Sequence, residues 1–306
     1  MKILIISFDQ YDKYNWGHQL FRNEIAKQHD VVFYGPGYTP DTTHLVKYLR
    51  KNKLSFNDFD FVFTHGLKYT KKISDISEIP PSLMKVHYVV DFFEPKGDFK
   101  GRDLAQYEFL NSYKPDVVFS VYHNSIKPLR QNIQCQNIFV LPFSVCTKHY
   151  KKINCKKKDQ VVTCFSTRVD AYPNRIKVLN HLKAEKIKHI KQKNRFDYIW
   201  AINESKISLG VCDIYKSLNM RVTEILSCGG LLLTDKPNYI EKLGLKENFH
   251  YVTYESFDDM VDKCRYYFKY DEERKKIENQ GMIHVQKYHS CYQRVREMIK
   301  IIQKIK

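Results

Sequence analysis

Arg221 and Glu224 are the two side chains whose types and spacing most directly suggest chemistry. They lie three residues apart in the run Asn219–Gly230, between apolar stretches at residues 207–211 and 231–234. Residues at this spacing share one face of a helix, and the N-terminus of a helix attracts phosphate. A cation and a carboxylate placed there suit a nucleotide, with the cation on the diphosphate and the carboxylate on ribose hydroxyls. From spacing alone, an ordinary ion pair on a solvated helix remains the alternative.

The surrounding sequence predicts the elements that position this pair. Gly229 and Gly230 can take positive φ values and end a helix. Leu231–Thr234 is too short for a helix, and its apolar run is typical of a strand buried on both faces. The order strand, short helix, double glycine and strand therefore predicts a βαβ unit, which binds ligands at the carboxyl ends of its parallel strands.

Two further arginines are candidates for holding phosphate. Arg168 follows a predicted strand at Val161–Phe165, and Arg175 begins a predicted helix that starts at Pro173. A guanidinium offers a planar fork of donors that matches phosphate oxygens. The alternative is that both are surface arginines of a basic protein.

Asp91 and His18 are the candidate proton-transfer groups of the first half. Asp91 follows the predicted strand Val86–Val90, where it would serve as a general base, although aspartate also favours turns and caps. His18 lies on the predicted helix Trp16–Gln28, and an ordinary helix-face histidine is its alternative.

Strand and helix patterns alternate through both halves of the chain, which predicts a doubly wound α/β protein. We expect an α/β domain at residues 1–148, a basic linker at 149–159 and a second α/β domain at 160–288. Residues 289–306 are expected to form a carboxy-terminal helix that packs back on the first domain. The sequence is helical in pattern from Phe257 almost to its end, with a break near His289-Ser290.

Composition limits the classes of function. The 306 residues carry 51 Lys and Arg against 34 Asp and Glu, a net charge of +17 that favours an anionic partner. The eight cysteines are scattered without metal-ligand spacing, which indicates reduced thiols in a cytoplasmic protein. No dinucleotide fingerprint or P-loop is present. Asp58-Phe59-Asp60 precedes a predicted strand and is interpreted as a turn rather than a metal site.

The run from Asn219 to Asp235 resembles the core motif N-x-R-x-[FT]-E-x-x-x-C-G-G-x-x-x-T-D of one enzyme family. This is the GT-B glycosyltransferase family with a group 1-type carboxy-terminal domain, in its CgeB-like branch. Asn203–Leu209 and the later Gly281 and His289 also resemble that family. The resemblance extends from about residue 160 to residue 296, and before that it is one of topology.

The resemblance implies two Rossmann-like domains that face a cleft and a metal-independent transfer of sugar from a nucleotide-sugar, without a cofactor. It supports donor binding by Arg221 and Glu224, and we expect Asn219, Arg168 and Arg175 to belong to the same site. Retaining relatives have a glutamate eight residues before the second one. Here that position is Lys216, so the stereochemistry stays open.

We therefore predict a transferase that moves a sugar to an acceptor hydroxyl, with Asp91 or His18 acting on that hydroxyl. An anionic acceptor is expected: a polysaccharide, a lipid-linked glycan or modified DNA. The alternative function is non-catalytic binding of nucleic acid or an anionic surface. A third possibility is peripheral membrane contact through a tail with Ile299, Ile302 and Ile305 beside Lys300 and Lys304.

Overall fold

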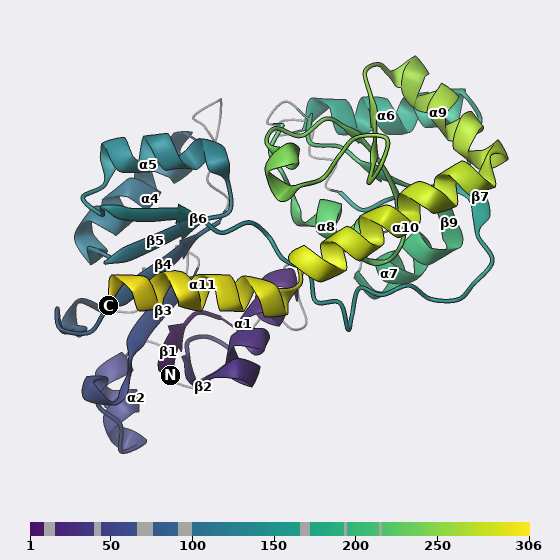
Figure 1. Cartoon of the computed structure of the whole chain (residues 1–306). Coiled ribbons are helices and arrows are strands. Elements are labelled where there is room, and N and C mark those ends of the chain that lie inside the picture. Colours follow the sequence, from purple (N-terminus) through teal and green to yellow (C-terminus); the bar gives the residue numbers. More distant parts are fainter. Residues whose placement is uncertain are drawn as a thin grey trace. The chain divides into compact units, whose positions relative to one another are not determined.

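The chain folds into two α/β units, which are described separately below (Figure 1). One unit comprises Met1–Pro142 and Arg294–Lys306, and the other comprises Phe143–Gln293. In this computed structural model the described residues are 1–8, 16–39, 44–65, 76–90, 100–165, 172–192, 195–213 and 216–306. Candidates Asp91 and Arg168 lie outside these residues.

The first unit is built on a six-stranded parallel sheet in the order β2-β1-β3-β4-β5-β6. Its strands are β1 (Lys2–Ile6), β2 (Asp30–Tyr34), β3 (Phe61–His65), β4 (Lys85–Val89), β5 (Val117–Ser120) and β6 (Asn137–Val140). Its described helices are α1 (Trp16–Gln28), α2 (Leu45–Lys51), α4 (Lys100–Tyr113), α5 (Ile126–Asn132) and the greater part of α11 (Cys291–Ile305). The helix predicted at Trp16–Gln28 is confirmed with these bounds.

The second unit has a five-stranded parallel sheet in the order β11-β10-β9-β7-β8. Its strands are β7 (Lys158–Thr163), β8 (His189–Lys191), β9 (Ser205–Gly210), β10 (Leu231–Asp235) and β11 (Val252–Tyr254). Its helices are α6 (Pro173–Ala184), α7 (Arg195–Glu204), α8 (Met220–Ser227), α9 (Phe257–Lys269) and α10 (Asp271–Tyr288). The break predicted near His289-Ser290 is where α10 ends and α11 begins.

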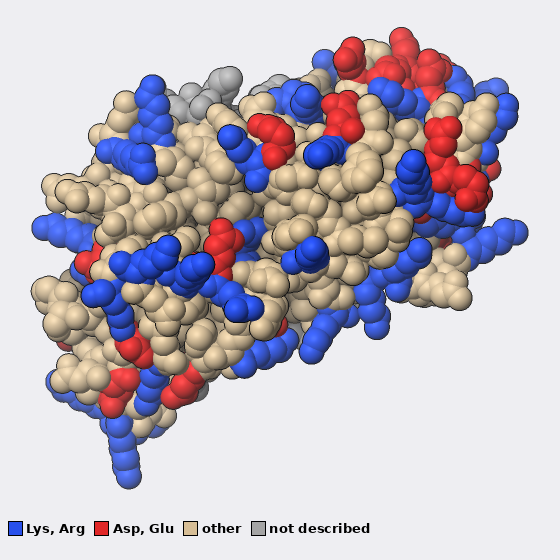
Figure 2. Space-filling model, viewed as in Figure 1, with Lys and Arg blue, Asp and Glu red and all other residues tan. Residues whose placement is uncertain are grey.

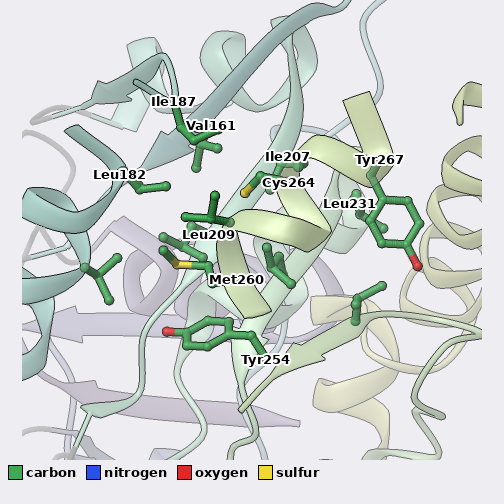
Figure 3. Packing of buried hydrophobic residues seen from close by; sticks show 14 of the residues in the cluster. Val161, Leu182, Ile187, Ile207, Leu209, Leu231, Tyr254, Met260, Cys264 and Tyr267 are labelled. Carbon is green, nitrogen blue, oxygen red and sulfur yellow. The ribbon is translucent and has the colours of Figure 1, made fainter. Parts of the chain in front are cut away.

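Apolar side chains of the second sheet alternate between two helical layers. Val161, Ile207 and Leu231 point toward α6 and α9, where they pack against Leu182 and Met260 (Figure 3). Helices α7, α8 and α10 contact the strands from the opposite face. Both faces of the parallel sheet are therefore covered, which explains why its strands read as nearly continuous apolar runs.

The predicted double glycine ends α8 as expected. Gly229 has a φ of 65°, which favours glycine at a helix C-terminus. A Cβ on Gly230 would lie 2.7 Å from Cγ2 of Ile202 on α7, so this position is restricted by close packing. The two glycines allow α8 to stop and β10 to begin directly.

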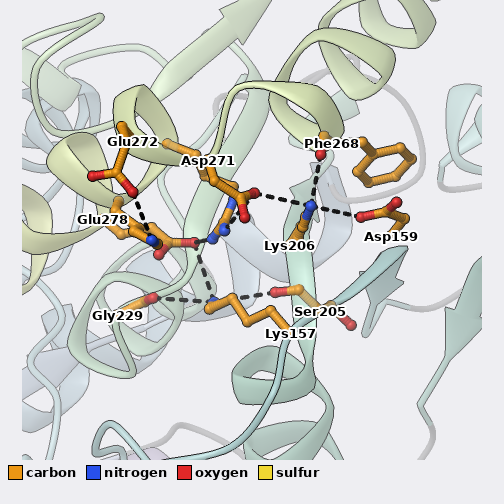
Figure 4. A network of polar contacts seen from close by, with 11 residues as sticks. Lys157, Asp159, Ser205, Lys206, Gly229, Phe268, Asp271, Glu272 and Glu278 are labelled. Atoms are coloured by element: carbon orange, nitrogen blue, oxygen red, sulfur yellow. Dashed lines mark hydrogen bonds and ion pairs between the residues drawn. The ribbon is translucent and has the colours of Figure 1, made fainter.

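The end of the predicted basic linker is part of the second unit's interior. Residues 151–157 lie in neither a helix nor a strand, but Lys157 Nζ is 3.1 Å from a Glu278 carboxylate oxygen (Figure 4). Arg274 donates to the same carboxylate at 2.6 Å and is 3.0 Å from Asp271, which also pairs with Lys206. Burial lowers the pKa of Lys157, and the Glu278 carboxylate opposes that shift.

The Asp58-Phe59-Asp60 segment has the turn conformation predicted for it. Asp58 closes a short 3-10 helix by accepting a hydrogen bond from the Ser55 amide at 2.6 Å, and Asp60 accepts one from the Lys2 amide at 2.9 Å. Both carboxylates therefore stabilise local backbone. The bond from the Ser55 amide lowers the pKa of Asp58, and bonds from the Lys306 side chain and then the Lys2 amide lower the pKa of Asp60.

Two of the carboxy-terminal isoleucines are not displayed for membrane insertion. Ile299 is 7% exposed and Ile302 is fully buried, so the apolar side of α11 belongs to the core of the first unit. These two side chains are therefore unavailable to a membrane, whereas Ile305 is half-buried, and peripheral membrane contact stays a prediction. No helix in the described part of the chain has the length and apolar character required to span a bilayer.

Positive charge is widely spread over the surface. On the face shown in Figure 2, Lys and Arg side chains are scattered over both units, and acidic side chains gather around α9 and the start of α10. This face shows no single basic stripe of the kind that follows a nucleic-acid backbone.

The buried carboxylate of Glu278 is expected to contribute strongly to stability. Glu278→Gln leaves the buried Arg274 and Lys157 cations without their shared carboxylate, which should cost about 3 kcal/mol of unfolding free energy. Glu272→Gln is the matched control on the same helix, because Glu272 is exposed and pairs only with exposed Lys275. Urea unfolding followed by circular dichroism should show a lower midpoint for Glu278→Gln alone. Equal midpoints for the two variants would contradict the assignment.

Candidate active site

The strand order of the second sheet creates its candidate site. β7 lies beside β9, although β8 comes between them in the sequence. In open α/β sheets, ligands bind at the carboxyl ends of strands where the strand order reverses in this way. The residues that follow β7, β9 and β10 are therefore the ones to consider first.

Asp235, the last residue of β10, organises the connection that follows β9. Its carboxylate accepts hydrogen bonds from the amides of Cys212 at 2.6 Å and Asp213 at 3.0 Å, and pairs with Lys216 Nζ at 3.1 Å. Burial raises the pKa of this carboxyl, while the amide and lysine contacts oppose the shift. Asp235 thus fixes the backbone between β9 and α8.

The carboxylate of Asp213 binds the free backbone amides at the N-terminus of α6. The residue is fully buried and adopts a left-handed conformation with a φ of 62°. Its carboxylate accepts hydrogen bonds from the amides of Asn174 at 2.9 Å and Arg175 at 3.1 Å. Tyr172, the residue at the N-cap of α6, makes no capping bond with its side chain. A distant aspartate therefore caps this helix in its place.

Arg175 is held within the wall of the site. It is 5% exposed, donates from Nη2 to the Val211 carbonyl at 3.2 Å and stacks on Tyr172 at 3.6 Å from the ring centroid. Burial lowers its pKa to about 10, and the positive charge of Arg221 adds to this shift. The structure therefore brings the predicted Arg175 and Arg221 close enough for their charges to interact.

Asn219, Arg221 and Glu224 are arranged around the first turn of α8. Asn219 caps the helix by accepting the Arg221 amide at 3.0 Å. Arg221 is half-buried, and its Nε is a buried donor with no hydrogen-bond partner among the described residues. Glu224 lies one turn further on and is 2% exposed. An unused donor beside a second guanidinium is suited to binding an anion.

Lys216 stands where retaining relatives would have their first glutamate. Its backbone is left-handed, with a φ of 48°, and its amine is the one paired with Asp235. The side chain at this position thus contributes to holding the loop after β9.

The first unit has an equivalent location between β1 and β3, which are neighbours although β2 separates them in sequence. Ser7, just after β1, donates from its hydroxyl to the carbonyl of His65 at the end of β3, at 3.3 Å. The ring of His18 on α1 contacts the ring of His65 edge-on, with centroids 4.8 Å apart. The structure therefore places the predicted His18 at the carboxyl edge of this sheet.

Several site residues were not predicted from the sequence. Asp213 has no distinguishing pattern, and Asp235 was noticed only as the end of a motif. Tyr198 on α7 contributes a buried hydroxyl without a hydrogen-bond partner in the described structure. Burial raises its pKa well above the usual value, and the nearby Glu224 carboxylate adds to this shift. A single buried tyrosine on a short helix gives no signal in the sequence.

A metal site does not emerge from the described residues, which contain no group of three or more His, Cys, Asp or Glu placed to hold an ion. Metal-independent chemistry therefore stays a prediction based on the resemblance.

Comparison with known proteins identifies the fold. Residues 151–300 match the profile of a family described as glycosyl transferase-like. A glycosyltransferase from Rickettsia africae aligns with a TM-score of 0.65 at 14% identity, covering 99% of this chain and 98% of that one. HepE from Anabaena, in complex with UDP-glucose, gives 0.69 at 12% identity, covering 99% and 100%.

A T4 phage BGT mutant in complex with UDP-glucose gives a TM-score of 0.64 at 13% identity and covers 99% of both chains. No curated protein matches the sequence. The structural likeness shows that the chain has the GT-B fold predicted for it.

Removing the Asp213 carboxylate should destabilise the second unit through α6. We expect Asp213→Gly to lower the unfolding free energy by about 1–2 kcal/mol, because the helix loses its cap. Glycine suits the left-handed backbone, so strain does not explain the loss. Asp213→Asn keeps one acceptor oxygen and should lose less. Thermal unfolding of the three proteins measures this order, and a glycine variant as stable as the parent would refute the capping role.

Proposed function

We propose that the protein transfers a sugar from a nucleotide-sugar to an acceptor hydroxyl, because residues 151–300 match the profile of a glycosyl transferase-like family. The observation that carries the proposal is the cluster formed by Arg221, Arg175 and Glu224 at the reversal of strand order. HepE and the T4 phage protein were determined with UDP-glucose, which supports a UDP-sugar as the first donor to test.

The donor would be held by the second unit. The half-buried guanidinium of Arg221 has a buried Nε–H without a partner in the described part of the chain, which it would offer to a diphosphate oxygen. Arg175 adds a second positive charge close enough to interact with it. Arg168 stays a proposed third contact. Glu224 would accept hydrogen bonds from ribose hydroxyls, and Asn219 holds the helix turn from which both side chains project.

The reaction requires a proton acceptor on one side and charge stabilisation on the other. The acceptor hydroxyl oxygen forms a bond to the anomeric carbon while its proton moves to a nitrogen of His18. The bond from the anomeric carbon to the phosphate oxygen breaks, and its electron pair leaves with the nucleoside diphosphate. The arginines stabilise that developing charge electrostatically, which is the role of a metal ion in other transferases, so no metal or cofactor is required by the proposal.

The acceptor class is proposed from charge alone. A net charge of +17 raises the local concentration of polyanions, so an anionic acceptor is favoured: a polysaccharide, a lipid-linked glycan or modified DNA. Asp91 remains a proposed second group on the acceptor side.

Glu224→Ala should weaken donor binding. Loss of a charged hydrogen-bond acceptor for ribose is expected to raise the Kd for UDP about 10- to 100-fold. Calorimetric titration of UDP measures this change, and Glu204→Gln is the control. Glu204 is a carboxylate of the same unit that pairs with exposed Lys158. A Glu224→Ala protein with the parent's UDP affinity and transfer rate would rule out the donor site proposed here.

His18→Asn should separate transfer from donor binding. We expect the rate of sugar transfer to fall about 10²- to 10⁴-fold, because the proton acceptor is lost. The Kd for UDP should stay unchanged, since the donor contacts lie in the other unit. Transfer is measured with a panel of nucleotide-sugars and the three acceptor classes. Full transfer by His18→Asn would eliminate the histidine as the base.

A further inference from the structure

Arg22 on α1 is a fully buried cation at the carboxyl edge of the first sheet. Its Nη2 donates to the Phe8 carbonyl at 2.8 Å and to Gln19 Oε1 at 2.7 Å, and its Nη1 lies 2.8 Å from Nδ1 of His65. Its Nε is 3.4 Å from the Tyr38 hydroxyl. The guanidinium thus joins the end of β1, its own helix and the end of β3.

The contact with His65 determines the state of that imidazole. A guanidinium only donates hydrogen bonds, so Nδ1 of His65 must carry a lone pair and accept. The proton of the neutral ring is then on Nε2. The hydrogen bond from Ser7 to the His65 carbonyl holds the backbone of the same residue in place. The tautomer of His65 is therefore set by the chemistry of its partner.

Among the described residues, the groups with an electrostatic effect on His65 are His18 and Arg22 from α1 and His87 from β4, and all three disfavour its protonation. The ring of Tyr88 from β4 also contacts His65, and its hydroxyl donates to the Leu141 carbonyl. Burial is the largest cause that lowers the pKa of His65 well below its usual value, and electrostatic interactions with His18, Arg22 and His87 add to this shift. His87 is itself buried and kept neutral, with its pKa lowered to about 3 by burial. Protonation of His65 and of His87 is therefore unfavourable.

The position of His18 connects this arrangement to chemistry. His65 is 3% exposed and cannot approach a substrate directly, whereas His18 is half-buried and touches the His65 ring edge-on. A base must be unprotonated before it can accept a proton. Arg22 contacts His65, which in turn contacts His18. A buried cation at this range opposes protonation of an imidazole, because like charges in a weakly polar interior repel.

We propose that Arg22 and His65 are positioning residues for His18. The guanidinium of Arg22 fixes the tautomer of His65 and keeps the imidazoles of His18 and His65, the imidazole pair, unprotonated. His18 can then accept the proton of the acceptor hydroxyl. This inference rests on the proposed function. It adds a reason for placing a cation, which is costly to bury, beside two histidines rather than an apolar side chain of similar size.

The test is the pH dependence of kcat/KM in Arg22→Gln. Removing the positive charge makes protonation of the imidazole pair easier, so the acidic limb of the profile should move to higher pH by about one unit. Below the limb, activity should then be about tenfold lower than in the parent. Above the limb it should be largely retained, with the KM for the donor unchanged. An acidic limb at the parent's pH would overturn the proposal.

Two companion variants exclude a merely structural role. Arg274→Gln removes another buried guanidinium, from the second unit, and should lower the melting temperature without moving the acidic limb. His65→Asn keeps an oxygen that can accept from Arg22 but cannot titrate. Its acidic limb should remain, because the proton acceptor is His18. Disappearance of the limb in His65→Asn would assign the titration to His65 and contradict the proposal.

A direct measurement separates this inference from the proposed function. Imidazole nitrogen chemical shifts of the parent should show a lone pair on Nδ1 of His65 and a proton on Nε2 from about pH 5 to pH 8. If no sugar is transferred, or if His18→Asn transfers normally, the proposed function fails while this tautomer is still measured. A His65 ring that protonates within that range, or that carries its proton on Nδ1, refutes the Arg22 role independently of activity.

Discussion

The parallel pairing of strands that are not consecutive in sequence is the constraint on which both candidate sites depend. β1 pairs with β3 in the first unit, and β7 pairs with β9 in the second. In each sheet, the connections that follow the two paired strands run to opposite sides. The backbone therefore separates at the carboxyl ends of these strands, and side chains from distant segments meet there. His65 reaches His18 for this reason, and Asp213 reaches the start of α6 in the same way.

The polar groups at the second sheet's edge divide into two kinds. The carboxylates of Asp213 and Asp235 are committed to backbone amides, which compensates for their burial and fixes the loop that follows β9. Arg175 is similarly committed to the Val211 carbonyl and the Tyr172 ring. Arg221 differs, since its buried Nε has no partner in the described structure. The residues with fixed contacts therefore surround a positively charged position, where Nε of Arg221 is the donor available to a ligand.

The sequence predicted the elements well where apolar periodicity was strong and failed where it was weak. Helix α1, the double glycine and the strands β4, β7, β9 and β10 follow from local pattern. Strand β8 has only three residues and α7 follows it closely, so neither gave a period that could be recognised. Side-chain partners were less accessible still, because Arg22 and His65 are 43 residues apart and only the fold brings them together. Spacing in the sequence cannot show such a contact.

Positive charge has a different reach at the surface and in the interior of this protein. The proposed donor site would use arginines to stabilise a leaving diphosphate, and the chain as a whole carries a net charge of +17. The same excess opposes protonation of any imidazole in the molecule, but only weakly across solvent, where salt screens it within about 10 Å. A buried guanidinium acts at short range without that screening. Placing Arg22 beside His65 therefore gives the proposed acceptor side a local field that the surface lysines, however numerous, cannot provide.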